Sequence, residues 1–229
     1  MGPLHIAIDG PVSAGKGTVA RGLAERLSIP YIDTGAMYRA AAYLAQTSGI
    51  SLEDVASVVR LVSEAKIEIR QPTSEERDGR LSTIILNGED ISWKIRSEEV
   101  GFGASVVSQH PQVRAILVAK QQEMARDRSV VMEGRDITTR VLPKAVVRIF
   151  LTASAEERAH RRQRQLKERG IIVPYEKVLS DLLARDRLDS TREVDPLRVT
   201  KGVWVLDTTD LTVPEVLEKI VKYIQKKGF

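Results

Sequence analysis

Short apolar runs alternate along this chain with stretches whose apolar residues recur at helical spacing. Runs of the first kind predict buried strands, and the sequence has five of them, at 4–8, 28–33, 129–136, 145–151 and 201–207. The stretch 16–27 is of the second kind, because Val19, Leu23 and Leu27 share one helical face. Strands separated by helices predict an α/β fold, in which a five-stranded parallel sheet is flanked by helices.

The other helices are indicated by their end signals. Gly49 closes a predicted helix that begins at 34, and Ser51, with Asp54 three residues later, has the pattern of another helix start. Further helices are expected at 97–127 with an interruption near Pro111, at 154–170, at 174–187, and from Thr212 onwards.

The apolar period changes to two after Lys66. The stretch 66–70 alternates, and 80–95 holds an Asn87-Gly88 turn between β-rich runs. The polar segment 71–79 is expected to be its exposed loop. The region 66–96 is therefore predicted to be a small antiparallel insert outside the parallel sheet.

The composition of the chain excludes several kinds of site and several classes of protein. The chain has no cysteine, which excludes disulfides and thiolate metal sites, and its three histidines show no metal-ligand spacing. The chain has neither an apolar run near the roughly 18 residues of a membrane helix nor a signal-peptide pattern, so a cytoplasmic protein away from membranes is expected. A net charge of +4 from mixed charges and 4% aromatic residues give little support for nucleic-acid binding.

The segment Gly10–Thr18 lies between the first strand and the first helix, and it spells G-x-x-x-x-G-K-G followed by threonine. Glycines let backbone N–H groups face an anion, the helix N-terminus adds positive charge, and Lys16 can reach the β- and γ-phosphates of a nucleotide. Gly17 occupies the usual Ser/Thr position and Thr18 follows, so which hydroxyl approaches Mg²⁺ stays open. An ordinary glycine-rich turn is the plainer alternative.

Polar motifs follow two other predicted strands. Residues 33–35 (Asp-Thr-Gly) come after the second strand, and residues 133–136 (Glu-Gly-Arg-Asp) end the third. Ligands of parallel sheets bind beyond the carboxyl ends of the strands. These motifs and the phosphate loop are therefore expected to converge on one site.

The chain resembles the bacterial cytidylate kinases, a branch of the nucleoside monophosphate kinases. The resemblance covers nearly the whole length and rests on segments 6–18, 33–39, 88–92, 133–137, 148–162 and 184–192. It implies a phosphate-loop (P-loop) NTPase fold with a mobile, arginine-rich lid. It also implies transfer of the ATP γ-phosphoryl group to CMP or dCMP, with Mg²⁺ held through the nucleotide, near Thr18 and Glu133, and no direct metal ligand assigned. We expect a monomer.

The resemblance also implies roles for individual residues. The ATP phosphates are expected at Gly10, Pro11, Val12, Ser13, Ala14, Gly15, Lys16, Gly17 and Thr18. The expected CMP site comprises Thr34, Tyr38, Arg39, Ser105, Arg114, Arg135, Asp136, Arg185, Asp189 and Arg192. The expected catalytic cations are Lys16, Arg135, Arg158, Arg162 and Arg192.

Within the CMP site the implied roles differ. Arg39 and Arg135 are expected to hold the acceptor phosphate, and Arg114 and Asp136 to face the cytosine edge, with Arg192 and Thr34 close by. Arg185 and Asp189 are expected to engage the sugar, and Ser105 is expected to hydrogen-bond Asp189. The implied division of the single kinase unit is a core of 1–33, 106–156 and 171–229, an acceptor region of 34–105, and a lid of 157–170.

Plainer roles remain open for several residues. Arg114 can be a surface charge, Asp189 an ion-pair partner of Arg185 or Arg192, Ser105 a core or local backbone contact, and Glu133 a structural group. The arginines of the predicted lid helix point in different directions, so about two of Arg158, Arg161, Arg162 and Arg164 are expected to face the site.

The sequence departs from the family pattern at a few positions. Ser13 stands where many relatives have glycine or alanine, Thr34 replaces a serine, Leu188 is apolar in a segment that can be more charged, and the stretch 138–140 differs. None of these changes removes a group that phosphoryl transfer needs. They leave the surroundings of the base and the acceptor phosphate less closely defined.

Two other functions compete with a cytidylate kinase. The first is another P-loop small-molecule kinase, acting on UMP, AMP, shikimate or a coenzyme precursor. The second is a nucleotide-binding protein without catalysis. The insert at 66–96 favours the cytidylate branch by analogy.

Overall fold

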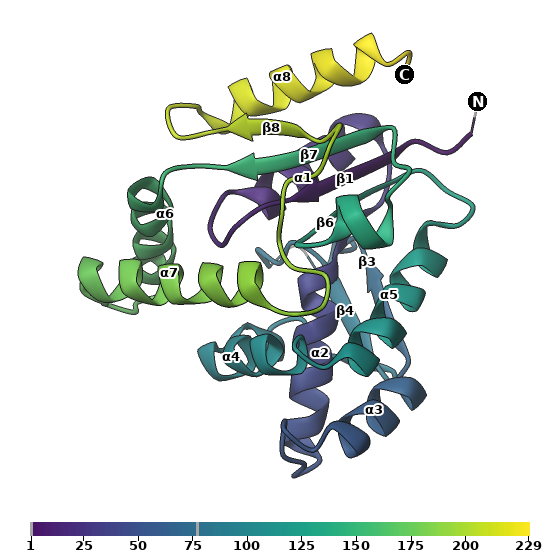
Figure 1. Cartoon of the computed structure of the whole chain (residues 1–229), viewed down its shortest axis with the longest axis vertical. Helices are drawn as coiled ribbons and strands as arrows, with labels where there is room; N and C mark the ends of the chain where they lie inside the picture. Colours follow the sequence, from purple (N-terminus) through teal and green to yellow (C-terminus); the bar gives the residue numbers. More distant parts are fainter. Residues whose placement is uncertain (1, 77) are drawn as a thin grey trace.

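The computed structural model describes residues 2–76 and 78–229, and a parallel sheet forms its centre (Figure 1). The strands are β1 (His5–Asp9), β2 (Tyr31–Asp33), β6 (Val130–Gly134), β7 (Val147–Thr152) and β8 (Trp204–Asp207). They lie in the order β2-β6-β1-β7-β8, and every neighbouring pair is parallel. This confirms the predicted five-stranded sheet, although β2 is shorter than the predicted 28–33.

Helices cover both faces of the sheet. Because side chains alternate along a strand, Ile6 and Ile8 of β1 face the core shared with α1 (Lys16–Leu27) and α8 (Val213–Lys226). Ala7 faces the opposite core, which includes α5 (Pro111–Ala125) and a π-helical turn at Ile137–Val141. No pattern in the sequence indicated that turn.

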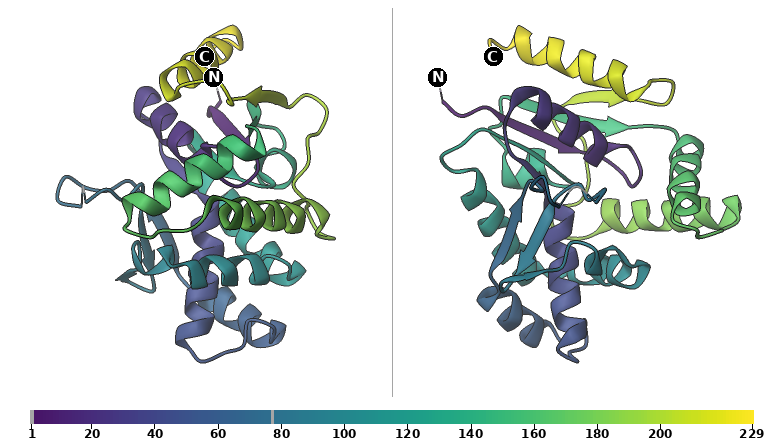
Figure 2. Two further views of the ribbon diagram at one scale, coloured as in Figure 1. Left: turned by 90° about the vertical axis from the view of Figure 1, so that its left-hand side faces the viewer. Right: turned by 180° about the vertical axis from the view of Figure 1, so that it is seen from behind.

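A second lobe is inserted between β2 and β6 (Figure 2). It contains α2 (Thr34–Thr47), α3 (Val55–Glu64), the antiparallel strands β3 (Ile67–Arg70), β4 (Thr83–Leu86) and β5 (Glu89–Asp90), a 3₁₀ turn (Lys94–Arg96) and α4 (Glu98–Val107). Asn87 and Gly88 turn the β4–β5 hairpin with φ of 50° and 89°. Positive φ at both positions is typical of the hairpin turn that an Asn-Gly pair favours, so the predicted insert is confirmed.

Two helices form an arm beside the sheet, at the left of Figure 1. They are α6 (Ala155–Glu168) and α7 (Tyr175–Thr191), and Ala159, Leu166 and Val178 pack between them. The Ser154 side chain accepts a hydrogen bond from the Glu157 N–H at 3.2 Å, as the sequence predicted for the start of α6.

Two helix ends differ from prediction. Asp54, rather than Ser51, caps α3, because its carboxylate accepts from the Ser57 N–H at 3.1 Å while Ser51 lies in the turn before it. Helix α7 continues past the predicted end at 187 to Thr191. Across 2–76 and 78–229, the model has no helix with the length and apolar character that a membrane span requires.

Candidate functional site

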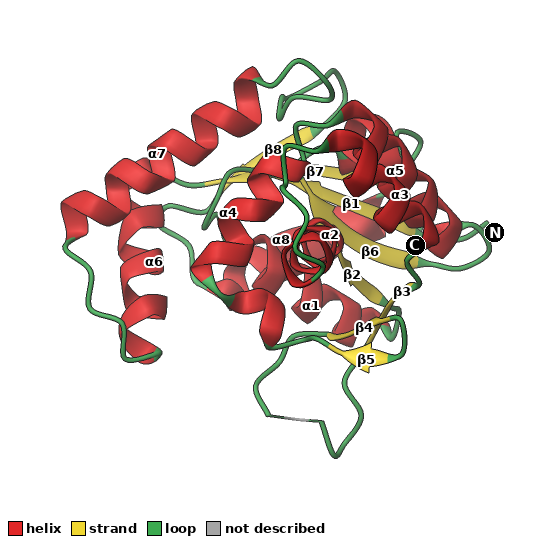
Figure 3. Ribbon diagram, turned by 90° about the horizontal axis from the view of Figure 1, so that it is seen from below, coloured by secondary structure: helices red, strands yellow, loops and turns green. Residues whose placement is uncertain are grey.

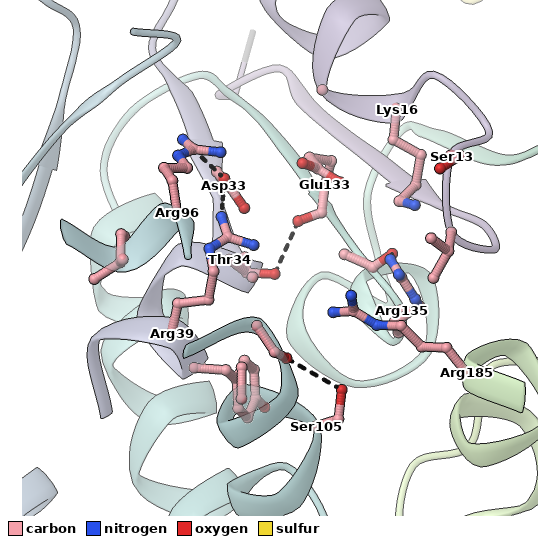
Figure 4. A pocket seen from close by; sticks show the side chains of 18 of the residues that line it. Ser13, Lys16, Asp33, Thr34, Arg39, Arg96, Ser105, Glu133, Arg135 and Arg185 are labelled. Atoms are coloured by element: carbon pink, nitrogen blue, oxygen red, sulfur yellow. Dashed lines mark hydrogen bonds and ion pairs between the residues drawn. The ribbon is translucent and has the colours of Figure 1, made fainter. Parts of the chain in front are cut away.

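A cavity of about 530 Å³ opens at the carboxyl ends of β1, β2 and β6 (Figure 4). Its lining includes the phosphate loop and residues of the second lobe. Figure 3, seen from below, shows helix α2 of that lobe end-on in front of the parallel sheet. Helix α7 contributes Arg185 and Asp189, and Arg192 lies at its C-cap. The expected convergence of three strand-end motifs on one site is thus present in the structure.

The phosphate loop turns tightly between β1 and α1. An added Cβ at Gly10 would lie 2.0 Å from the Leu151 carbonyl oxygen, so only glycine fits there. Gly15 caps α1 with a φ of 89°, in the left-handed region that glycine adopts without strain. The N-terminus of α1, which begins at Lys16, therefore faces the cavity with its positive dipole end.

Lys16 is held inside this loop. It is 6% exposed, and its Nζ donates to the Pro11 carbonyl at 2.8 Å. Burial and the neighbouring guanidinium of Arg135 lower the pKa of Lys16 to about 7. A polyphosphate placed in the loop would favour the charged form of this amine.

Glu133 lies at the end of β6, facing the start of α1. The Tyr31 hydroxyl donates to Glu133 Oε1 at 3.2 Å, and a Cβ added at Gly17 would lie 3.5 Å from the same oxygen. Burial and the charge of Asp33 raise the pKa of Glu133, and Lys16 acts against them. The residues described here form no cluster of three or more acidic, histidine or cysteine side chains that could hold a metal. One carboxylate and the exposed Thr18 hydroxyl fit a Mg²⁺ ion that keeps most of its ligands as water and phosphate oxygens.

Several arginines face the cavity from the acceptor side, and their partners are carboxylates of the chain. Arg39 donates to Asp33 at 2.7 Å, and Arg135 Nε donates to Asp189 at 2.6 Å. Burial disfavours ionised Asp33, but the charge of Arg39 prevails and lowers the pKa of this carboxyl. Burial and the charge of Arg135 lower the pKa of Arg185 to about 10.

Some buried polar atoms at this cavity lack a partner among the described residues. These are Tyr38 Oη, Arg39 Nε and Arg185 Nε, and all three side chains line the cavity. Buried donors that stay unpaired cost free energy. They are suited to a ligand that brings hydrogen-bond acceptors, as phosphate and sugar oxygens do.

An ion pair of Arg114 and Asp136 forms the deepest wall of the acceptor side. The two residues are 2% and 3% exposed and pair through Arg114 Nη2 and Asp136 Oδ2. The Arg114 guanidinium lies 5.6 Å from the centroid of the Tyr38 ring. Burial raises the pKa of Asp136 to about 6, although Arg114 and Arg192 pull it down. The alternative of a surface charge at Arg114 is therefore wrong.

The expected partners of two residues differ in the structure. Ser105 lines the cavity, but its hydroxyl donates to the Gly101 carbonyl at 3.4 Å, one helical turn earlier, and not to Asp189 (Figure 4). The Asp189 carboxylate accepts from Arg135 instead of pairing with Arg185 or Arg192. The Arg135–Asp189 bond joins residues 54 positions apart, which helical periodicity cannot match, whereas the Ser105 bond stays within one turn of α4.

The arginines of α6 also point in several directions. Arg162 lines the cavity and pairs with Glu98 of α4. Arg158 lies outside the described cavity lining, Arg161 binds the Thr208 backbone carbonyl at 2.7 Å, and the Arg164 side chain is 67% exposed. Arg161 Nη1 also lies 3.8 Å from a Cβ added at Gly15 of the phosphate loop, so Arg161 and Arg162 lie beside the site, in line with the expected number. Arg158, expected among the catalytic cations, contacts the backbone of the phosphate loop and lies outside the described cavity lining.

Sequence reasoning missed three residues that shape the site. Arg96 lines the cavity without belonging to a motif that marks it, and Arg169 lines it from the predicted lid, where no individual role was assigned to it. Asp9 is fully buried at the end of β1, and its carboxylate accepts from the Ile137 and Thr138 N–H groups at 2.8 Å each. It thereby fixes the turn that follows Asp136. A charged residue ending an apolar strand was the available signal for Asp9.

Comparison with known proteins gives consistent matches over the whole chain. A family model described as Cytidylate kinase matches residues 6–226. A cytidylate kinase from Caldanaerobacter subterraneus subsp. tengcongensis is 48% identical, covering 97% of this chain and 95% of the relative. One from Bacillus subtilis (strain 168) is 43% identical, covering 98% of each chain. The crystal structure of an uncharacterized protein from Eubacterium ventriosum ATCC 27560 covers 97% of this chain and 98% of its own at 13% identity and a TM-score of 0.53, a likeness of fold alone.

Proposed function

Because this chain belongs to the cytidylate kinase family, we propose that it transfers the γ-phosphoryl group of ATP to CMP and dCMP. The family match over residues 6–226 is the observation that carries this proposal. The cavity supports it, since a phosphate loop faces a cluster of arginines across a space of about 530 Å³.

Phosphoryl transfer depends on the positioning of the two phosphates and on positive charge around them more than on a general base. An oxygen of the acceptor phosphate forms a bond to the γ-phosphorus, the bond from that phosphorus to the β-bridging oxygen breaks, and ADP leaves with the electron pair. Lys16 and the loop amides hold the donor phosphates, while Arg39 and Arg135 hold the acceptor phosphate. The acceptor oxygen is already an anion, so no general base is needed.

Mg²⁺ accompanies ATP in this proposal. When bound, it would neutralise part of the negative charge on the donor phosphates. Thr18 and Glu133 are the residues that would lie nearest to it and hold it through its water ligands, and no other residue is assigned to it.

The acceptor nucleoside lies toward the Arg114–Asp136 pair. Cytosine and uracil exchange a donor for an acceptor at position 4, so a wrongly paired base leaves a buried polar group unsatisfied, at a cost of about 1–3 kcal/mol. The sugar lies toward Arg185 and Asp189, with Thr34, Tyr38, Ser105 and Arg192 completing the lining. The Arg135–Asp189 bond then has to open or rearrange when a sugar hydroxyl binds Asp189.

We also propose a monomer that divides as the family pattern implies. The core is 1–33, 106–156 and 171–229, the acceptor region is 34–105, and the lid is 157–170. Arg162 and Arg169 are the lid arginines that already line the cavity, which supports their closing over the donor phosphates.

The test is an initial-rate panel with ATP and Mg²⁺ in which CMP, dCMP, UMP, AMP and shikimate are separate acceptors. CMP and dCMP are expected to be used comparably, and UMP about tenfold less well or worse in kcat/KM. Preference for AMP or shikimate would contradict the proposal in favour of another P-loop kinase. ATP binding without transfer to any acceptor would indicate a protein without catalysis.

A further inference from the structure

A largely buried ion pair binds the phosphate loop from outside the described cavity lining. Arg158 of α6 and Asp186 of α7 form this pair through Arg158 Nη1 and Asp186 Oδ2. Asp186 Oδ1 accepts a hydrogen bond from the Val12 N–H at 3.0 Å, and Arg158 Nη1 donates to the Val12 carbonyl at 3.1 Å. Both polar backbone groups of one loop residue are therefore bound by two helices that lie more than a hundred residues further along the chain.

The backbone conformation of the residue after Val12 explains why these hydrogen bonds to Val12 are needed. Ser13 has a φ of 58°, in the left-handed region that a side chain other than glycine rarely adopts. A conformation of this kind costs free energy and persists only where its surroundings hold it. The carbonyl that Arg158 binds belongs to the peptide unit joining Val12 to Ser13, so the ion pair acts on the strained turn directly.

Holding α6 against α7 does not require this pair. The two helices already pack through Ala159, Leu166 and Val178, and the rings of His160 and Tyr175 stack with centroids 4.6 Å apart. Arg158 is also fixed independently, because its Nε donates to the Ala153 carbonyl at 3.0 Å. The pair thus attaches the loop to the first turn of α6 and to α7.

We propose that Arg158 and Asp186 are positioning residues that set the shape of the phosphate loop for the donor nucleotide. The Val12 N–H is committed to Asp186, so the loop amides that follow Ser13 are the ones presented to the phosphates. Loss of either Arg158 or Asp186 releases the Val12–Ser13 peptide. The loop can then depart from the conformation that binds the phosphates. The proposal rests on the proposed function only for the identity of the donor.

The test compares donor and acceptor affinity in Asp186→Ala and Arg158→Met. We expect the ADP dissociation constant, measured by calorimetry, and the KM for ATP to rise about tenfold, the effect of losing one charged hydrogen bond. The KM for CMP is expected to stay within about twofold. Asp181→Ala and Arg187→Met, both on α7, are matched controls, since both residues are exposed and lie outside the described cavity lining, and they should change neither value.

A charge-swapped double variant, Arg158→Asp with Asp186→Arg, separates positioning from helix attachment. It keeps an attraction between α6 and α7 but presents a donor to the Val12 N–H and an acceptor to its carbonyl. We expect its melting temperature to exceed that of either single variant while ADP binding stays weak. Recovery of ADP affinity in the swapped protein, or equal increases of the ATP and CMP KM values in the single variants, would overturn the proposal.

A milder substitution keeps the test decisive if the single variants unfold. Arg158→Lys retains a charged donor for the Val12 carbonyl, so it should bind ADP more tightly than Arg158→Met, and equal weakening in the two would contradict the proposal. ADP binding needs no acceptor. A wild-type protein that binds ADP but does not phosphorylate CMP would refute the proposed function and leave this test intact.

Discussion

Nucleotide binding should be coupled to proton uptake through Lys16. Burial and the nearby Arg135 lower the pKa of this amine to about 7. About half of the molecules therefore carry a neutral lysine at pH 7 and about nine-tenths at pH 8. The β-phosphate of ADP places negative charge at the loop, which raises the pKa of Lys16 and draws a proton from solution.

The magnitudes follow from that pKa. Binding of ADP should take up about 0.5 proton at pH 7 and about 0.9 at pH 8. If only the charged amine binds well, the dissociation constant should rise about fivefold between these pH values. The ligand contributes little at pH 8, because the second pKa of a terminal phosphate lies near 6.

Titration calorimetry at pH 8 in buffers with different ionisation enthalpies measures this uptake. The slope of observed enthalpy against buffer enthalpy is expected to give about 0.9 proton for the wild type and near zero for Lys16→Met. A wild-type slope of zero would refute the lowered pKa. An unchanged slope in Lys16→Met would show that a group other than Lys16 takes up the proton.

Two further predictions concern stability. Arg114→Met leaves buried Asp136 without its main cation, so the free energy of unfolding should fall by about 3–5 kcal/mol at pH 8. The loss should be smaller at pH 5, since burial raises the pKa of Asp136 to about 6 and the carboxyl is then protonated. Urea unfolding at both pH values checks this, the exposed Arg126→Met serves as control, and equal losses would contradict it. Gly10→Ala should cost about 1–3 kcal/mol, because its Cβ would meet a backbone oxygen at 2.0 Å, whereas Gly101→Ala meets nothing within 4 Å and should cost nothing in the same assay.

Features that depend on neighbouring residues were predictable from the sequence. The glycine pattern of the phosphate loop, the Asn87-Gly88 turn and the capping box of Thr212 and Glu215 each act over a few residues, and all are present. The strands were recognisable because buried apolar runs differ from helical spacing. Their order in the sheet required the structure, since hydrophobic pattern alone does not distinguish neighbouring strands.

Contacts between distant segments were not predictable in this way. The bond between Asp9 and Thr138 spans 129 residues, and the bond between Arg158 and Val12 spans 146. Each depends on how helices pack on the sheet and not on local spacing. Ser105 shows the opposite error, because a backbone carbonyl one turn away satisfies its hydroxyl where a distant partner was expected.

The pairing of cavity arginines with the chain's own carboxylates has a consequence for selectivity. Arg39 with Asp33, Arg135 with Asp189 and Arg162 with Glu98 each already hold an anion. A phosphate that binds any of these arginines competes with the carboxylate already paired with it. Its observed binding free energy is therefore the difference between the free energies with which the arginine binds the phosphate and the carboxylate. Polyanions that merely bring charge, such as nucleic acid, gain little from this exchange despite a pI of 9.3. A nucleotide gains more, because it places its oxygens in the geometry of several guanidinium groups at once.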